Sequence, residues 1–153
     1  ELKGNRVYSY TRKMIQWHKK QGHLVIFISG SPDFLVSRMA QKWGADDFCG
    51  SIYHVKDNVL SGEISPMWDS VNKMKSIDMF CKKYNIDLKE SYAYGDTHGD
   101  YSMLMLTGHP RAINPSLELL NSIKENKELK EKTEIIIERK DVIYKVTADV
   151  ETL

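Results

Sequence analysis

The sequence predicts an α/β fold built around a mainly parallel sheet. Two apolar runs, residues 24–28 and 134–138, have the composition of strands that are buried on both faces. A third, shorter run of small and aromatic residues at 91–94 ends at Gly95. The segments between these runs carry apolar residues at spacings of three and four, the pattern of amphipathic helices. Strands that alternate with helices in this way are typical of parallel sheets.

The bulk composition bounds the class of protein. A chain of 153 residues is long enough to bury a core, and its 22 basic and 21 acidic residues give a formal charge of +1. This balance argues against a nucleic-acid partner. No apolar run is long enough to span a membrane and no signal peptide is visible, so we expect no membrane partner. Cys49 and Cys81 have no metal or redox spacing, which favours a reduced, cytoplasmic protein.

Residues 6–20 form the first predicted helix, and Gly22 lies where a C-terminal cap would end it. Its apolar positions are Val7, Tyr10, Met14 and Trp17. After the first strand, Ser31 can cap the next helix and Pro32 suits its first position. We expect this second helix to end at Gly44. Its inward side chains are expected to be Phe34, Leu35, Met39 and Trp43.

Two short β-like runs at 48–55 and 59–64 predict a hairpin, because residues 56–58 between them (Lys-Asp-Asn) favour a turn. Residues 69–84 predict another amphipathic helix. The apolar residues on one side of this helix are Val71, Met74, Ile77, Cys81 and Tyr84.

The last third of the chain continues the alternation of strands and helices. Residues 111–113, 134–138 and 142–146 predict strands. Asn114 followed by Pro115 suits the start of the helix between the first two of them. The apolar stripe of that helix is Leu117, Leu120 and Ile123.

Two carboxylates follow the strand at 91–94. Asp96 and Asp100 are four positions apart, with small or polar residues between them. Ligands of open α/β sheets bind at the carboxyl ends of the strands, and carboxylates presented there suit Mg²⁺. The alternative is a structural role, in which Asp96 caps a helix and Asp100 is a favourable charge in its first turn. His98, between them, either faces the site as an acid–base group or faces solvent.

Two further strand ends or helix starts carry polar groups. Ser29 and Gly30 follow the first strand, and a hydroxyl with free backbone N–H groups there either binds an anion or forms a plain turn. Lys73 and Lys75 lie near the start of the helix at 69–84. One of them can hold a phosphoryl group as a point charge, or both can be solvated. An anion-binding hydroxyl, a cation and a metal site together are what phosphoryl transfer requires.

Three stretches that carry these residues resemble the haloacid dehalogenase (HAD) superfamily, in its phosphoserine-phosphatase-like branch. The stretches are VIFISGSP (25–32), NKMKSIDMF (72–80) and YGDTHGDYSML (94–104), and GHPRAINP (108–115) continues the likeness. The resemblance implies an HAD-like Rossmannoid three-layer α/β/α core in residues 23–153, with a hairpin at about 48–64. It implies that residues 1–22 are the end of a helical cap region.

The resemblance also implies a role for each candidate residue. Ser29 and the Gly30 N–H would bind the phosphoryl oxygens, and Lys73, rather than Lys75, would stabilise the phosphate. Lys73 is preferred because the alignment then puts the apolar positions of the family on Met74 and Ile77. Asp96 would bind Mg²⁺ directly. Asp100 would support the metal through water or orient the lysine.

The main departure from the family is the absence of its first motif. In relatives an Asp-x-Asp-x-Thr motif near the N-terminus supplies the nucleophile, which forms an aspartyl-phosphate. No such motif precedes Ser29. We therefore expect the nucleophile strand and most of the cap to lie outside this chain, and the chain alone to be inactive. A shortened match at residues 148–153 raises the alternative of a permuted nucleophile at Asp149, against that of a polar tail.

The resemblance thus implies a Mg²⁺-dependent hydrolase of small phosphomonoesters, with the N-terminal segment of the same protein as a partner of this chain. A non-catalytic module that binds phosphate or metal through Ser29, Lys73 and Asp96 is the alternative. A phosphoaspartate receiver domain fits less well, because Ser29 and Gly30 stand where its acceptor aspartate would belong.

Overall fold

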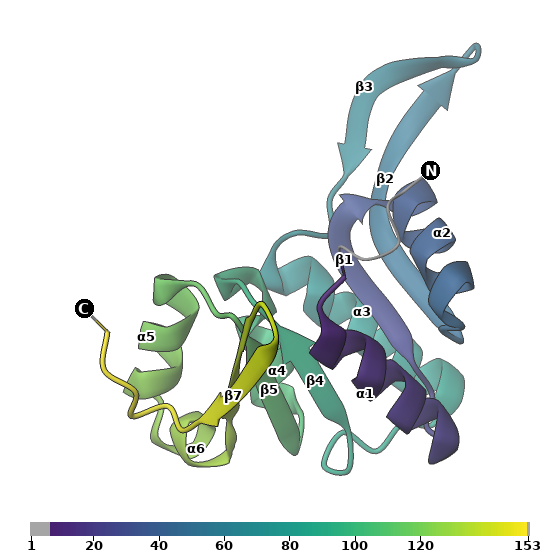
Figure 1. Ribbon diagram of the computed structural model, residues 1–153. Helices are drawn as coiled ribbons and strands as arrows, with labels where there is room; N and C mark the ends of the chain where they lie inside the picture. The colour runs from purple at the N-terminus through teal and green to yellow at the C-terminus, as the bar shows by residue number, and fades with distance from the viewer. Residues whose placement is uncertain (1–6, 153) are drawn as a thin grey trace. The chain divides into compact units, whose positions relative to one another are not determined.

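The computed structural model describes residues 7–152, and the chain divides into two compact units between Trp68 and Asp69. The elements of the first unit are α1 (Ser9–Lys20), β1 (Ile26–Pro32), α2 (Asp33–Trp43), β2 (Asp47–Lys56) and β3 (Val59–Ser65). The second unit begins with α3 (Ser70–Tyr84), β4 (Tyr92–Gly95), the 3₁₀ turn η1 (His98–Asp100) and α4 (Tyr101–Leu106). It continues with β5 (His109–Ile113), α5 (Leu117–Glu125), α6 (Lys127–Lys132), β6 (Glu134–Arg139) and β7 (Val142–Val146) (Figure 1). The predicted α/β class is confirmed.

The first unit contains a three-stranded sheet in the order β1-β2-β3. β1 and β2 run parallel, and β2 and β3 form the predicted antiparallel hairpin. Asp57 and Asn58 at its tip both have positive φ, 52° and 62°, which suits the two-residue turn that joins twisted strands. Figure 1 shows the hairpin extending beyond the end of β1.

β1 differs from the prediction of a fully buried strand. Its residues are half-buried or exposed, because β1 lies at the edge of its sheet and pairs only with β2 among the described strands. The inner face of α2 also differs from the prediction. Val36 and Ala40 are buried, whereas Phe34 and Leu35 are exposed, since α2 packs on β1 and β2 through its other side. The apolar spacing located this helix but not its buried face.

The second unit contains a four-stranded sheet in the order β4-β5-β6-β7. The first three strands are parallel and β7 is antiparallel to β6. Alternate side chains of the sheet pack against α4, α5 and α6. The buried members of this core are Ala93, Leu104, Ala112, Leu119, Leu120, Ile123, Leu129, Ile135 and Ala148.

α5 begins later than predicted. Ser116 is its N-cap, and its hydroxyl accepts a hydrogen bond from the Leu119 N–H at 3.3 Å. Asn114 instead adopts a positive φ of 45° and its side-chain oxygen accepts a hydrogen bond from the Glu138 N–H at 2.9 Å. Asn114 therefore joins the ends of β5 and β6 and does not cap the helix.

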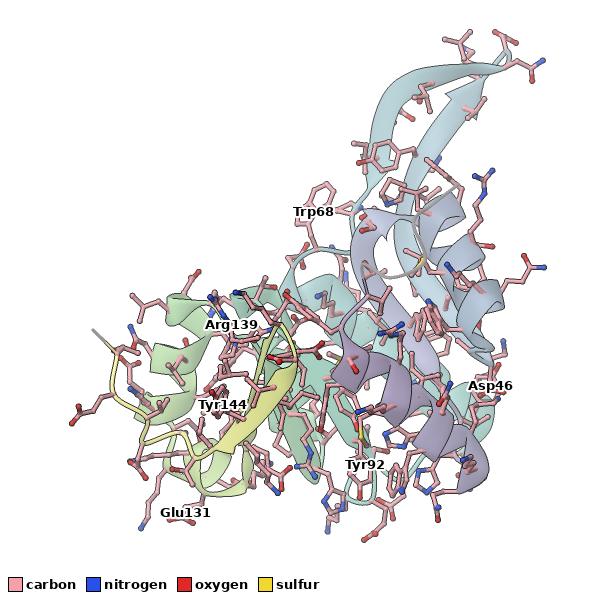
Figure 2. All side chains as sticks on the ribbon, in the orientation of Figure 1. Asp46, Trp68, Tyr92, Glu131, Arg139 and Tyr144 are labelled. Carbon is pink, nitrogen blue, oxygen red and sulfur yellow. The ribbon has the colours of Figure 1, made fainter. Side chains whose placement is uncertain are left out.

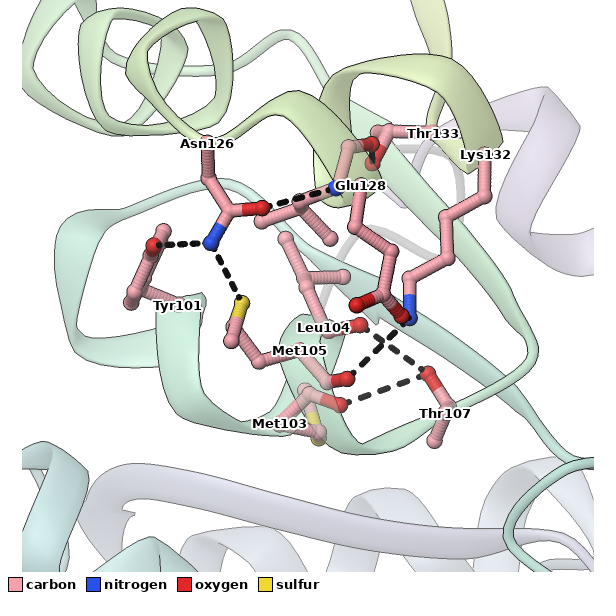
Figure 3. A network of polar contacts seen from close by, with 10 residues as sticks. Tyr101, Met103, Leu104, Met105, Thr107, Asn126, Glu128, Lys132 and Thr133 are labelled. Atoms are coloured by element: carbon pink, nitrogen blue, oxygen red, sulfur yellow. Dashed lines mark hydrogen bonds and ion pairs between the residues drawn. The ribbon is translucent and has the colours of Figure 1, made fainter.

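Asn126 joins α5 to α6 and to α4 (Figure 3). Its side-chain oxygen accepts the Leu129 N–H at 2.9 Å as the N-cap of α6. Its amide nitrogen donates to the Tyr101 hydroxyl at 3.3 Å and lies 3.2 Å from the Met105 sulfur. Lys132 donates to the Met105 carbonyl oxygen at 3.2 Å. One side chain thus ties the turn between two helices to the helix that follows the candidate site.

No helix in the part of the chain from residue 7 to residue 152 is both long and apolar enough to cross a membrane.

Candidate active site

The candidate site of the second unit is built on the end of β4. Gly95 closes this strand, and Asp100 folds back over it from the following turn. A Cβ placed on Gly95 would lie 2.8 Å from the Asp100 Cγ, closer than such atoms approach in proteins. Glycine is therefore required here by the close approach of a carboxylate, and not by backbone conformation.

Asp100 is held by four hydrogen-bond donors. Its Oδ2 accepts from the Asp96 N–H at 3.0 Å, the Thr97 N–H at 3.2 Å and the Thr97 hydroxyl at 3.3 Å. Its Oδ1 lies 2.5 Å from the Lys73 ammonium group. The side chain of Asp100 is 8% exposed. A buried carboxylate with this many donors has one fixed orientation.

Thr97 was not singled out from the sequence. It is the N-cap of the turn η1, and Thr97 and Asp100 form a capping box in which each side chain bonds the backbone of the other residue. The signal that could have found it is the Thr-x-x-Asp spacing of residues 97–100, read as a cap and not only as part of a metal motif.

Lys73 reaches Asp100 from the first turn of α3. Asp69 caps this helix by accepting the Asn72 N–H at 2.9 Å. The buried face of α3 carries Lys73, Ser76, Ile77 and Phe80. Lys75 is exposed and no contact joins it to the described carboxylates of the site. Of the two candidate lysines, the structure brings Lys73 to Asp100.

Asp96 differs from Asp100 in its surroundings. Its side chain is exposed, and no ion pair or hydrogen bond from another side chain reaches it among residues 7–152. Partial burial and the charge of Asp100 raise the pKa of Asp96, while its own N–H and the Lys73 charge act in the opposite direction. A carboxylate that is partly desolvated and lies near a second carboxylate is disfavoured in its ionised form, and a bound cation would stabilise that form.

Asp96 is the one candidate for a direct protein ligand of a metal that the described part of the second unit offers at this strand end. No group of three or more His, Cys, Asp or Glu side chains that could hold a metal ion occurs within residues 7–152. Of the two predicted ligands, Asp96 is open to solvent, and both oxygens of Asp100 already accept hydrogen bonds. The residues fit one direct ligand, with the others to come from elsewhere.

Ser29 and Gly30 belong to the first unit and are described separately. The sequence suggested that they follow the first strand and begin the next helix. In the structure they lie within β1, and α2 begins only at Asp33. Pairing with β2 is regular up to Ile28 and resumes at Pro32, so four steps of β1 face the two steps of β2 from Cys49 to Ser51. The residues between Ile28 and Pro32 therefore form an arch in the strand. We call residues 29–31 the arch.

Two other predicted candidates lie away from these groups or are engaged elsewhere. Asp149 forms an ion pair with Lys130 on α6 at 2.5 Å. Because α6 leads into the start of β6, Asp149 lies at the opposite end of the sheet from Asp96. The His98 ring stacks on Tyr101 and its Nδ1 lies 3.2 Å from the Ser122 hydroxyl of α5. His98 therefore has structural contacts with α4 and α5.

A comparison with models of protein families identifies the family of the chain. The model of the haloacid dehalogenase-like hydrolases matches residues 2–105, more than half of the chain. The chain belongs to this family. The match includes Ser29, Lys73, Asp96 and Asp100, and it confirms the resemblance inferred from the sequence.

Members of the family with known names or structures are also similar. Phosphoserine phosphatase of Methanocaldococcus jannaschii is 30% identical over 81% of this chain and 54% of its own length. Phosphoserine phosphatase SerB1 of Mycobacterium tuberculosis is 25% identical over 82% of this chain and 41% of its own length. A phosphoserine phosphatase structure with an analogue of its phospho-aspartyl intermediate has a TM-score of 0.64 and 27% identity, over 85% of this chain and 58% of that one. The chain thus spans about half the length of these relatives.

Proposed function

We propose that this chain is part of a Mg²⁺-dependent phosphomonoester hydrolase that works through an aspartyl-phosphate, with the nucleophilic aspartate outside these 153 residues. The observation that carries the proposal is the buried Lys73–Asp100 pair beside the open carboxylate of Asp96. A buried ion pair has a desolvation cost that a purely structural core would avoid. Enzymes that transfer phosphoryl groups use fixed cationic groups and a metal ion to neutralise the charge on the phosphoryl oxygens.

Each unit would contribute separate groups to this chemistry. In the second unit, Lys73 would neutralise the charge on the phosphoryl oxygens, and Asp100 would hold the ammonium group in place. Asp96 would be the direct ligand of Mg²⁺, which when bound supplies electrostatic stabilisation of the phosphoryl group. In the first unit, the Ser29 hydroxyl would donate a hydrogen bond to a phosphoryl oxygen.

The proposed reaction transfers the phosphoryl group twice. The P–O bond of the ester breaks as a bond to the carboxylate of the outside aspartate forms, and the alkoxide that leaves takes a proton from water to become the alcohol. Water then attacks phosphorus, the aspartate leaves, and inorganic phosphate is released. Serine phosphate is one candidate substrate, because two similar relatives are phosphoserine phosphatases. The substrate class proposed is a small phosphomonoester.

The two lysines of α3 give a matched test. A longer form of the protein that includes the segment upstream of Glu1 is assayed for Mg²⁺-dependent release of phosphate from p-nitrophenyl phosphate. We expect Lys73→Met to lower kcat/KM by at least about a hundredfold, since an interaction with the transferring group of this kind supplies roughly 3 kcal/mol. Lys75→Met, two residues away and exposed, should leave it unchanged.

Three results would count against the proposal. Equal effects of the two substitutions would show that Lys73 has no special role in the reaction. Activity that is independent of Mg²⁺ would show that the reaction does not need the metal. Binding of phosphate without turnover in the longer protein would favour the alternative, a module that binds phosphate or metal without catalysis.

A further inference from the structure

The Ser51 hydroxyl is fully buried beneath the arch and is not part of the site proposed above. Ser51 lies on β2 with 0% of its surface exposed. Its hydroxyl oxygen accepts a hydrogen bond from the Met67 N–H at 3.0 Å, and its hydrogen is donated to the Gly30 carbonyl oxygen at 2.8 Å. Both hydrogen-bonding directions are therefore defined, because a hydroxyl has one hydrogen to give.

The bond from Ser51 sets the orientation of the peptide between Gly30 and Ser31. In a trans peptide the C=O and the following N–H point in opposite directions, and no cis peptide bond occurs among the described residues. With the Gly30 carbonyl drawn toward Ser51, the Ser31 N–H points the other way. It donates to the Ser29 hydroxyl oxygen at 3.2 Å.

This arrangement leaves the hydrogen of the Ser29 hydroxyl available. Its oxygen accepts the Ser31 N–H, and no acceptor for its O–H is found within residues 7–152. The hydrogen bonds thus form a chain in which all donors point the same way: the Met67 N–H donates to Ser51, the Ser51 hydroxyl donates to the peptide of Gly30 and Ser31, and the N–H of that peptide donates to Ser29. Hydrogen bonds in such a chain polarise one another, so each donor strengthens the next.

The arch is also fixed by contact. A Cβ on Gly30 would lie 2.9 Å from the Trp68 Cβ, and a Cβ on Gly50 would lie 2.9 Å from the Ser31 carbonyl oxygen. Figure 2 labels Trp68, whose side chain is half exposed where it follows β3. The peptide between Gly30 and Ser31 therefore has little room to rotate, and the buried Ser51 hydroxyl determines which way its C=O and N–H groups point.

We propose that Ser51 is a positioning residue, which orients the arch so that the Ser29 hydroxyl donates its hydrogen to a phosphoryl oxygen. The inference rests on the proposed function of Ser29. Removing the Ser51 hydroxyl would leave the Gly30 carbonyl and the Met67 N–H without this partner and would free the Ser31 peptide to turn. The Ser29 hydroxyl would then lose its fixed orientation.

A double-mutant cycle tests this role in the 153-residue chain. Inorganic phosphate is titrated into the wild type, Ser51→Ala, Ser29→Ala and the double variant, and its dissociation constant is measured by phosphorus NMR. We expect Ser51→Ala to weaken phosphate binding roughly two- to tenfold, the range of one hydrogen bond. In the Ser29→Ala background the same change should have no further effect. The amide proton of Ser31 should shift in Ser51→Ala.

Two further variants separate positioning from loss of structure. Ser51→Cys keeps a side chain of the same shape, slightly larger than serine, that donates only weakly, and should fall between the wild type and Ser51→Ala, which also covers the case in which Ser51→Ala does not fold. Ser61→Ala removes a hydroxyl that donates to the His54 carbonyl oxygen at 3.1 Å in the same hairpin, and should leave phosphate binding unchanged.

The outcomes distinguish the inference from the function on which it rests. If the wild type binds phosphate and Ser51→Ala weakens it equally in both backgrounds, or not at all, the positioning role is overturned and the role of Ser29 stands. If Ser29→Ala binds phosphate as tightly as the wild type, or if neither of them binds it, the proposed role of Ser29 is overturned, and the inference with it.

Discussion

The Lys73 ammonium group lies 2.5 Å from Oδ1 of Asp100, and the two side chains are 7% and 8% exposed. The two side chains differ in the number of hydrogen bonds that they make. Asp100 accepts three further hydrogen bonds, all from residues 96 and 97, whereas its carboxylate is the one partner of the Lys73 ammonium group found in the described part of the chain. The carboxylate is fixed by its own loop, and the lysine depends on the carboxylate.

This asymmetry predicts unequal costs for breaking the pair. Asp100→Ala should lower the free energy of unfolding by about 3–5 kcal/mol, because it leaves a buried ammonium group without its partner. Lys73→Met should cost less, since the Asp100 carboxylate keeps three donors. Urea unfolding of both variants measures the difference. The control is Lys82→Met, which breaks an exposed pair with Asp78 on the same helix and should change stability by less than about 0.5 kcal/mol. A larger cost for Lys73→Met than for Asp100→Ala would contradict this account.

Asp96→Asn should stabilise the fold at neutral pH. The folded protein raises the pKa of Asp96 above its ordinary value of 3.8, so it binds a proton at this carboxyl more tightly than the unfolded chain does. The ionised carboxylate therefore costs stability, and this cost grows as pH rises from 3.8 through the raised pKa. Asparagine carries no charge and avoids the cost.

The measurement is urea unfolding of the wild type and Asp96→Asn between about pH 7 and pH 4. The advantage of the variant should shrink as the pH falls. Added Mg²⁺ should stabilise the wild type and not the variant, because binding to the folded state shifts the equilibrium by mass action. A variant that is less stable than the wild type at neutral pH, with no Mg²⁺ present, would refute the claim that the ionised carboxylate of Asp96 costs stability.

Gly95→Ala should disturb the site through a steric clash. The new methyl group would push against Asp100, so the carboxylate or the end of β4 must move, at a cost of about 1–3 kcal/mol. Gly62→Ala is the matched control, because Gly62 has a positive φ of 86° and open space around it. Both variants should lose stability, but only Gly95→Ala should also weaken the binding of Mg²⁺. Equal metal binding by the two variants would show that Asp100 does not need the space at Gly95.

Asn126→Ala should destabilise the second unit by about 1 kcal/mol or more, since it removes the N-cap of α6 together with the contacts to α4 (Figure 3). Asn121→Ala, the same substitution at an exposed position of α5, should be neutral or slightly stabilising. Thermal unfolding of both variants tests the pair. Equal melting temperatures would mean that the network contributes little.

Much of the fold was predictable because it is local. Alternation of strands and helices, the hairpin with its turn near residues 56–58 and the glycine that ends α2 at residue 44 were all visible in the sequence. The buried faces of the helices were less visible. Val71 and Met74 were expected inward on α3, but they are 61% and 46% exposed. The buried face of α3 instead includes Lys73, whose ammonium group is buried because it pairs with the carboxylate of Asp100, 27 residues further along the chain.

The residues of the candidate site could be proposed from the sequence, but the contacts between them could not. The sequence motif predicted that Asp96 and Asp100 lie close together. It did not show that Asp96 is exposed while Asp100 is buried and hydrogen-bonded, because this difference arises from the fold of the turn at 97–100. The role of Ser51 had no signal in the sequence. It lies 22 residues from Ser29, and only the pairing of β2 with β1 brings its hydroxyl beneath the arch.

We propose that these residues serve a phosphatase whose nucleophile lies outside them. The most direct measurement is Mg²⁺-dependent release of phosphate from p-nitrophenyl phosphate by the 153-residue chain, alone and with the upstream segment supplied as a separate polypeptide. We predict no release by the folded chain alone, and release on addition of the segment that is lost in Lys73→Met. Release by the chain alone that is lost in Asp149→Asn would contradict the account, because the nucleophile would then lie within these residues.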